Sequence, residues 1–143
     1  MKTLIVEDDL TSRTVLEEML APYGEISSCV DGNDAVDLFR ASLVKGPAFD
    51  LVLMDIMMPE KSGLDALKEI RSAEERRGHI GDSAAKVIMT TALGDSKTIL
   101  SAFRNACDGY LVKPVHRARL IEQLRSLKLI VEDVPTTQQQ LPL

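Results

Sequence analysis

Cysteine is scarce in this chain of 143 residues. Only Cys29 and Cys107 are present, and no two cysteines have the CxxC spacing. We therefore expect neither a disulfide framework nor a zinc site. Two free thiols are typical of a protein in a reducing cytoplasm, and this is the location that we predict.

Long apolar runs and blocks of positive charge are also missing. No apolar run approaches the length of a transmembrane helix, and the N-terminus has no charged region followed by a signal-peptide cleavage site. The net charge is −5, and no basic block opposes it. We therefore predict neither a membrane partner nor direct binding of nucleic acid.

What the chain does contain is an alternation of apolar runs and helical patterns. The clearest run is Leu51–Asp55, where four apolar residues lead into one carboxylate before a loop that contains Pro59. Such a run is typical of a strand covered on both faces. One of the expected helices carries Ile99, Leu100 and Phe103 as its apolar face. Five expected strands alternate with five helices and predict an α/β fold with a parallel sheet between helices. The strands are expected at residues 3–6, 25–30, 51–55, 87–89 and 110–112.

Polar side chains follow four of these strands. Glu7 and Asp8 follow the first, Asp55 ends the third, Thr91 follows the fourth and Lys113 follows the fifth. The carboxyl ends of parallel strands lie at one edge of the sheet, where open α/β sheets bind their ligands. If these strands are neighbours, the side chains converge on one shallow site.

The chemistry of this set is specific. Clustered carboxylates raise one another's pKa unless a cation neutralises them, and hard oxygen ligands suit Mg²⁺. Lys113 can reach a phosphoryl oxygen, and the Thr91 hydroxyl can donate to another. No histidine lies at a strand end and no Ser-His pair is evident, so nucleophilic acyl transfer has no candidate residues. A carboxylate that accepts a phosphoryl group is the reaction that these residues best support.

The ordered set of motifs resembles the receiver domain of response regulators in two-component signalling, including the single-domain chemotaxis type. The resemblance covers residues 2 to about 128. The motifs that carry it are Glu7-Asp8, the Leu51–Asp55 run, Pro59 and Gly63, Thr91-Ala92, and Tyr110-Leu111-Val112-Lys113-Pro114.

The resemblance implies a flavodoxin-like, doubly wound sheet of five strands in the order 2-1-3-4-5, with five surrounding helices. It implies that Asp55 accepts a phosphoryl group from a phosphohistidine on a sensor histidine kinase or a histidine phosphotransfer protein. Asp8, Asp55 and the Met57 backbone carbonyl would ligate Mg²⁺, and Glu7 would act mostly through water.

The resemblance also implies a switch. Lys113 would pair with Asp55 and then with the phosphoryl group, Thr91 would approach the phosphoryl oxygen, and Tyr110 would turn inward behind it. The Lys113–Pro114 peptide bond would be cis, as only bonds before proline readily are. The fourth helix, fifth strand and fifth helix would form the surface that a downstream protein target binds.

The receiver domain is expected over residues 1–130, and residues 131–143 are expected to be a polar, disordered tail, because Pro135 and three consecutive glutamines end the apolar pattern. No effector domain is evident, so the output passes through a partner surface or the chain is a piece of a larger protein. We expect a signalling switch that assists its own aspartyl phosphorylation and dephosphorylation and is not an enzyme.

Three other functions fit less well. A hydrolase of the haloacid dehalogenase type would need a second acid two residues after Asp55, and Met57 stands there. A degenerate receiver that serves only as an interaction module would not need the full set of acids, Thr91 and Lys113. A flavin or dinucleotide binder would need a phosphate-cradling loop after the first strand, but three consecutive acids, Glu7 to Asp9, would repel phosphate without a metal.

Overall fold

In a computed structural model, residues 1–92 and 96–131 are described. The predicted tail, apart from Val131, lies outside the described residues. Five parallel strands form one sheet in the order β2-β1-β3-β4-β5. Both the α/β class and the strand order 2-1-3-4-5 are therefore confirmed. The strands are β1 (Lys2–Val6), β2 (Glu25–Cys29), β3 (Leu51–Asp55), β4 (Lys86–Thr91) and β5 (Gly109–Val112).

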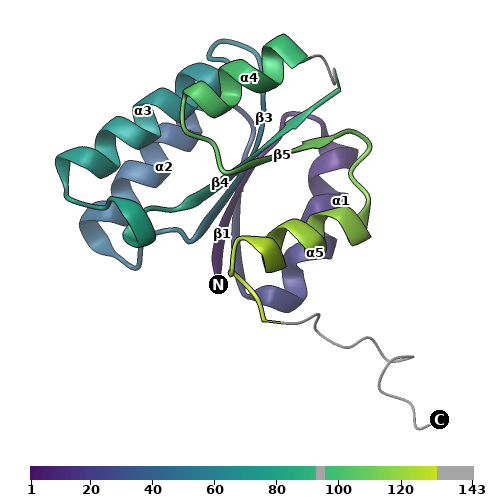
Figure 1. The fold of residues 1–143 in the computed structure, drawn as a ribbon, viewed down its shortest axis with the longest axis horizontal. Coiled ribbons are helices and arrows are strands. Elements are labelled where there is room, and N and C mark those ends of the chain that lie inside the picture. The colour runs from purple at the N-terminus through teal and green to yellow at the C-terminus, as the bar shows by residue number, and fades with distance from the viewer. Residues whose placement is uncertain (93–95, 132–143) are drawn as a thin grey trace, which may run out of the picture.

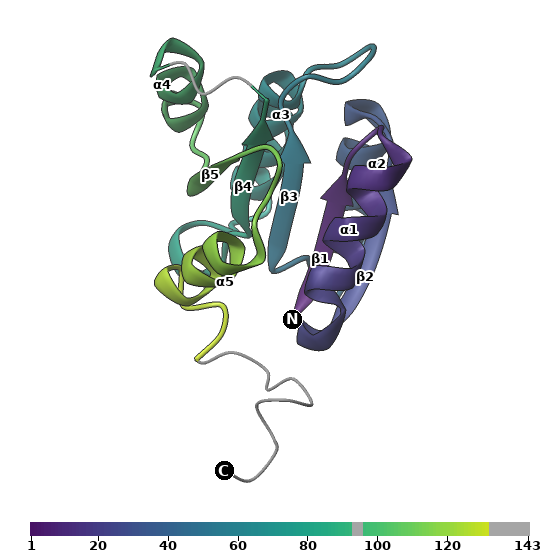
Figure 2. The ribbon, with the colours of Figure 1, turned by 90° about the vertical axis from the view of Figure 1, so that its right-hand side faces the viewer.

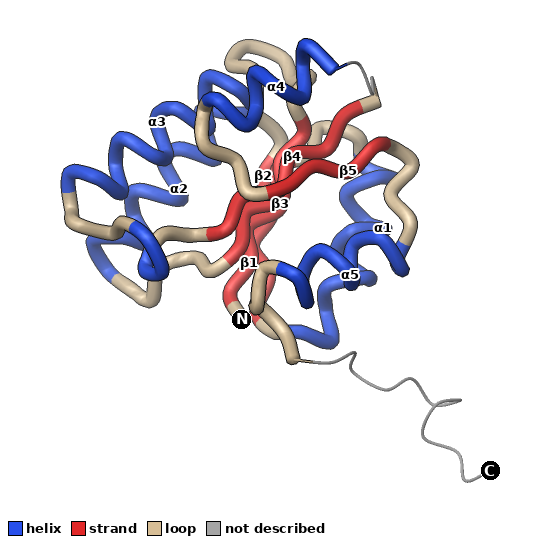
Figure 3. The backbone as a smooth tube through the Cα atoms, viewed as in Figure 1, coloured by secondary structure: helices blue, strands red, loops and turns tan. Residues whose placement is uncertain are grey.

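Helices cover both faces of the sheet (Figures 1 and 3). One apolar cluster joins the sheet to α2, α3 and α4, and a second joins it to α1 and α5. The helices are α1 (Leu10–Leu20), α2 (Gly32–Lys45), α3 (Gly63–Arg76), α4 (Ser96–Arg104) and α5 (Arg117–Ser126), with short 3₁₀ turns at η1 (Ala21–Tyr23) and η2 (Gly81–Ser83). Among the described residues, none of these helices is both long and apolar enough to cross a membrane.

The register brings the ends of the strands level. Every residue of β3 is buried, as the run of apolar residues predicts for a central strand. Val6 at the end of β1 pairs with Met54, and Asp55 pairs with Thr90 of β4. Thr91 pairs in turn with Val112 of β5. The residues that end or follow these strands therefore meet at one edge.

The predicted apolar face of α4 is only partly buried. Ala102 is the buried residue of this helix, whereas Leu100 is 54% exposed and Phe103 is 45% exposed. The helix lies toward the β5 edge of the sheet and not over its centre (Figure 2), so part of its apolar face stays in solvent. The pattern correctly predicted the helix but not how much of it packs.

Both cysteines are free and buried. Burial raises the pKa of the Cys29 thiol to about 12 and that of the Cys107 thiol to about 11. Nearby carboxylates, Asp34 for Cys29 and Asp108 for Cys107, add to the effect. Because the thiolate is the reactive form, both groups should be inert near neutral pH.

At pH 8 we expect native Cys29 and Cys107 to react with a thiol reagent at least about 100-fold more slowly than the same cysteines in the unfolded chain, because few molecules carry the thiolate and the sulfurs are buried. The absorbance of the reporter group that the reagent releases gives the reaction rate, in native buffer and in guanidinium. Rapid native reaction of either thiol would contradict the burial described here.

A partly buried ion cluster joins α3 to β4 and to the turn before β5. Arg71 Nη1 donates to Glu74 Oε1 at 2.7 Å, and Nη2 donates to Asp108 Oδ2 at 2.8 Å. Glu74 is 2% exposed and also accepts the Ala85 N–H at 2.6 Å. The Val87 N–H donates to Asp108 at 2.8 Å. One guanidinium therefore neutralises two carboxylates, and both of these accept backbone N–H groups at the start of β4.

Arg71→Ala is expected to lower the free energy of unfolding by about 3 kcal/mol, because the buried Glu74 carboxylate loses its counter-charge. Urea unfolding followed by circular dichroism measures the change. Arg76→Ala, an exposed arginine in the same helix, is the control and should change it by less than about 0.5 kcal/mol. Equal effects of the two substitutions would show that the cluster is not stabilising.

Candidate functional site

Three carboxylates meet at the carboxyl ends of β1 and β3. Glu7, Asp8 and Asp55 each place one oxygen within 4.8 Å of the others. Glu7 is 1% exposed and Asp55 5% exposed, whereas Asp8 is open to solvent. The pairing of β1 with β3 produces this arrangement, because Glu7 and Asp8 directly follow β1 and Asp55 ends β3.

Lys113 supplies the positive charge of the site. Its Nζ lies 2.8 Å from Asp55 Oδ2 and 2.5 Å from Glu7 Oε1. Burial acts against the charged ammonium, but the hydrogen bonds to Asp55 and Glu7 outweigh it and raise the pKa of Lys113. Burial also raises the pKa of Glu7, and repulsion by Asp55 adds to this, while the bond from Lys113 opposes it. The ammonium is therefore fixed in its charged form between two acids.

The loop after β3 folds tightly against the phosphoacceptor candidate. The Met57 N–H donates to Asp55 Oδ1 at 3.1 Å, and the Gly63 N–H donates to the Ile56 carbonyl at 2.8 Å. A β-carbon on Gly63 would collide with the Asp55 carbonyl oxygen, so this approach requires glycine. The loop fixes both the orientation of the carboxylate and the position of the Met57 backbone beside it.

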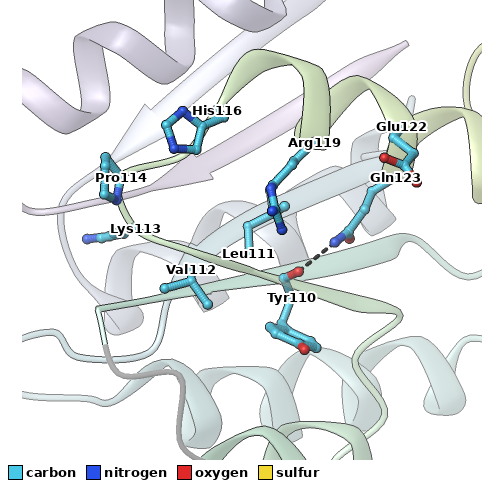
Figure 4. A pocket seen from close by; sticks show the side chains of 9 residues that line it. All are labelled: Tyr110, Leu111, Val112, Lys113, Pro114, His116, Arg119, Glu122 and Gln123. Carbon is cyan, nitrogen blue, oxygen red and sulfur yellow. Dashed lines mark hydrogen bonds between the residues drawn. The ribbon is translucent and has the colours of Figure 1, made fainter.

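β4 and β5 carry two more predicted residues, Thr91 and Tyr110. Thr91 is buried, and its carbonyl accepts the Lys113 N–H at 2.8 Å. The Lys113–Pro114 peptide bond is cis, as the resemblance implied. Tyr110 is half-buried and points away from Lys113 (Figure 4). Its ring packs edge-on against Phe103 of α4, with the centroids 6.0 Å apart.

Two neighbours complete the surroundings of Glu7. Asp9 lies outside the carboxylate cluster and caps α1, accepting the Ser12 N–H at 2.8 Å. Arg13, which the sequence analysis did not single out, donates from Nη1 to the Glu7 carbonyl at 3.0 Å. Its position one helical turn after the acids is the only signal that could have pointed to it. Arg13 holds the β1–α1 turn in place but does not neutralise the carboxylates directly.

The balance of charge suits a divalent cation. Three clustered carboxylates face one ammonium, so the site keeps an excess of negative charge. Mg²⁺ typically binds through one or two carboxylates and keeps several waters, and the exposed Asp8 leaves room for them. The set of oxygen donors therefore fits Mg²⁺, without the nitrogen or sulfur ligands that zinc prefers.

The comparison with known protein families agrees with this geometry. The family model described as the response regulator receiver domain matches residues 3–125. The chain is a response-regulator receiver domain.

Relatives of this receiver domain include whole proteins and parts of larger ones. It is 30% identical over 128 residues to the chemotaxis protein CheY of Thermotoga maritima, covering 88% of this chain and 96% of that protein. It is 32% identical over 127 residues to the transcriptional regulatory protein CpxR of Escherichia coli (strain K12), covering 88% of this chain and 48% of CpxR. The chain spans about half the length of the transcriptional regulators that it matches.

Among solved structures, this receiver domain is similar to a chain in the CheX–CheY–BeF₃–Mg²⁺ complex from Borrelia burgdorferi. The TM-score is 0.76 at 27% sequence identity, and the match covers 90% of this chain and 89% of that chain. The family, the sheet and the strand order that the sequence motifs implied are therefore all confirmed.

Proposed function

We propose that this receiver domain is a phosphorylated switch in which Asp55 accepts a phosphoryl group from a phosphohistidine of a sensor histidine kinase or a histidine phosphotransfer protein. The observation that carries the proposal is the Asp55 carboxylate itself. It is 5% exposed, lies at the end of the central strand, and is held by Lys113 on one oxygen and by the Met57 N–H on the other.

In the proposed reaction, an Asp55 carboxylate oxygen forms a bond to phosphorus as the phosphorus–nitrogen bond of the phosphohistidine breaks, and the imidazole leaves. Such transfers need positioning and cancellation of charge more than covalent help from the protein. Lys113 would need to move little to contact the transferring phosphoryl group, because its Nζ is already 2.8 Å from the accepting carboxylate. It would neutralise part of the charge on the transferring oxygens.

The acids around Asp55 would hold a metal ion. Asp8 and Asp55 with the Met57 carbonyl are the proposed direct ligands of Mg²⁺, and Glu7 would act mostly through water. Bound Mg²⁺ supplies further neutralisation of the phosphoryl oxygens. Glu7 also orients Lys113, because the two groups are 2.5 Å apart.

Phosphorylation would then act as a switch. It replaces one carboxylate charge by about two negative charges. That charge would favour approach of the Thr91 hydroxyl and an inward turn of Tyr110, which now packs against Phe103. Because Phe103 belongs to α4, the proposed output surface of α4, β5 and α5 would be altered, and a downstream protein would bind it differently.

Beryllofluoride or acetyl phosphate with Mg²⁺ tests the proposal. The chain has no tryptophan, so ¹H–¹⁵N spectra are the more informative probe. We expect shifts at Asp55, Thr91, Tyr110 and Lys113 that depend on both Mg²⁺ and the phosphoryl analogue. Spectra unchanged by saturating Mg²⁺ and either reagent would refute the proposed switch.

A further inference from the structure

The sheet ends at β5, which is paired on one side only. The Lys113 N–H donates to the Thr91 carbonyl, so the backbone at residue 113 faces β4. Successive residues of a strand direct their backbone groups to alternate sides. The backbone groups of Tyr110 and Val112 therefore face the free edge, and Val112 is 45% exposed.

One side chain covers this edge. Gln123 of α5 donates from Nε2 to the Tyr110 carbonyl at 2.5 Å (Figure 4). Its Oε1 lies against Gly109, where a β-carbon would collide with it. The Gln123 amide thus occupies the position of a peptide group from a neighbouring strand. A side chain that protects an edge in this way can be displaced without breaking the sheet.

Two hollows follow the edge on either side of this amide, and both are lined by Tyr110 and Gln123. The larger, about 520 Å³, extends past Lys113 and Pro114 toward α5. The smaller, about 190 Å³, extends toward Phe103 of α4. Their linings share Tyr110 and Gln123 and together include every residue of β5, and we name the pair of hollows the β5 groove.

Arg119 is the group of the β5 groove that favours an acidic occupant. The acids of the groove are Glu122 and Asp108, and Arg71 already neutralises Asp108. Lys113 also lines it but is held by Glu7 and Asp55. No carboxylate of the described part of the chain forms an ion pair with Arg119, although the protein as a whole carries a net charge of −5. An exposed valine next to an unpaired arginine suits a segment that alternates apolar and acidic side chains.

We propose that an extended, acidic segment of the downstream partner adds to the free edge of β5 as a further strand. It displaces the Gln123 amide from the Tyr110 carbonyl, packs an apolar side chain against Val112 and places a carboxylate at Arg119. This inference rests on the proposed function only in that the segment belongs to the output partner. Strand addition uses backbone hydrogen bonds for affinity and alternate side chains for specificity.

A synthetic peptide of about eight residues that alternates valine and glutamate is long enough to span the groove and serves as the probe. Titration of the full chain is followed by ¹H–¹⁵N spectra, at the Val112 amide and the Gln123 side-chain amide. Val112→Pro removes the outward N–H, and proline is tolerated at such edge positions. We expect it to weaken binding at least about tenfold, whereas Val112→Thr, which keeps the N–H, should bind as wild type.

Two further variants test the other contacts. Gln123→Ala uncovers the Tyr110 carbonyl and should tighten binding about fivefold. Arg119→Ala should weaken binding of this peptide but not of one in which lysine replaces glutamate. Strand addition would be overturned if Val112→Pro and Val112→Thr bound the peptide equally well. It would also be overturned if a peptide N-methylated at alternate residues bound as well as the unmethylated one.

The same samples separate this inference from the proposed function. If beryllofluoride and Mg²⁺ shift the spectra but no peptide binds in either state, strand addition is wrong and the switch stands. If neither reagent shifts the spectra but the peptide binds with the expected pattern of variants, the groove is confirmed as a strand-binding site and the switch is refuted.

Discussion

Asp55→Asn is expected to abolish phosphorylation by acetyl phosphate and the spectral response to beryllofluoride. A carboxamide is a poor nucleophile and cannot form the acyl phosphate, so incorporation should fall at least about 100-fold. The fold should survive, because asparagine has nearly the same shape and its side-chain oxygen can accept the Met57 N–H that Asp55 Oδ1 now accepts at 3.1 Å. Intact-protein mass measures the incorporated phosphoryl group.

Asp9→Asn is the matched control for this variant. It removes the same charge from the same edge of the sheet, but Asp9 lies outside the carboxylate cluster and caps α1. Asparagine is as good an N-cap as aspartate, so both fold and phosphorylation should be retained. If Asp9→Asn loses phosphorylation as fully as Asp55→Asn, or if Asp55→Asn keeps it, the assignment of Asp55 is wrong.

Lys113→Ala is expected to keep Mg²⁺ binding and lose the conformational response. The substitution leaves Glu7 and Asp55, both nearly buried, without their shared counter-charge. Without metal the variant should be less stable by about 3 kcal/mol. Mg²⁺ should restore much of this stability, because the cation then neutralises the same carboxylates. Thermal unfolding with and without Mg²⁺ measures the difference.

The response to beryllofluoride separates the role of Lys113 in the switch from its role in stability. In Mg²⁺ the variant should be folded, yet the shifts at Thr91 and Tyr110 should be absent. Lys68→Ala, an exposed lysine on α3, should resemble wild type in both measurements. Normal shifts in Lys113→Ala would show that the lysine does not transmit the signal.

Much of this architecture could be predicted from the sequence because the central strands leave a strong local signal. In Leu51–Asp55, four apolar residues lead into one acid, which indicates both a buried strand and the location of its functional end. The order of the strands in the sheet, in contrast, has no such local signal. Alternating strands and helices are compatible with several parallel sheets, and only the resemblance to receiver domains supplied the order that the structure has.

Features made by residues far apart in the chain left no such signal. Arg71 and Asp108 are 37 residues apart and pair only after β4 and β5 are placed. The bond from Gln123 to the Tyr110 carbonyl depends on the position of α5 over the edge strand. The exposure of Leu100 and Phe103 depends on how α4 meets the edge of the sheet, which helical periodicity does not specify.

The most direct test of the account is the location of the phosphoryl group after incubation with acetyl phosphate and Mg²⁺. Peptide mass spectrometry of the wild-type chain, quenched in acid to preserve the acyl phosphate, identifies the modified residue. We predict a single phosphoryl group on Asp55 and none on Glu7 or Asp8. A phosphoryl group on another residue, or no incorporation at all, would contradict the account.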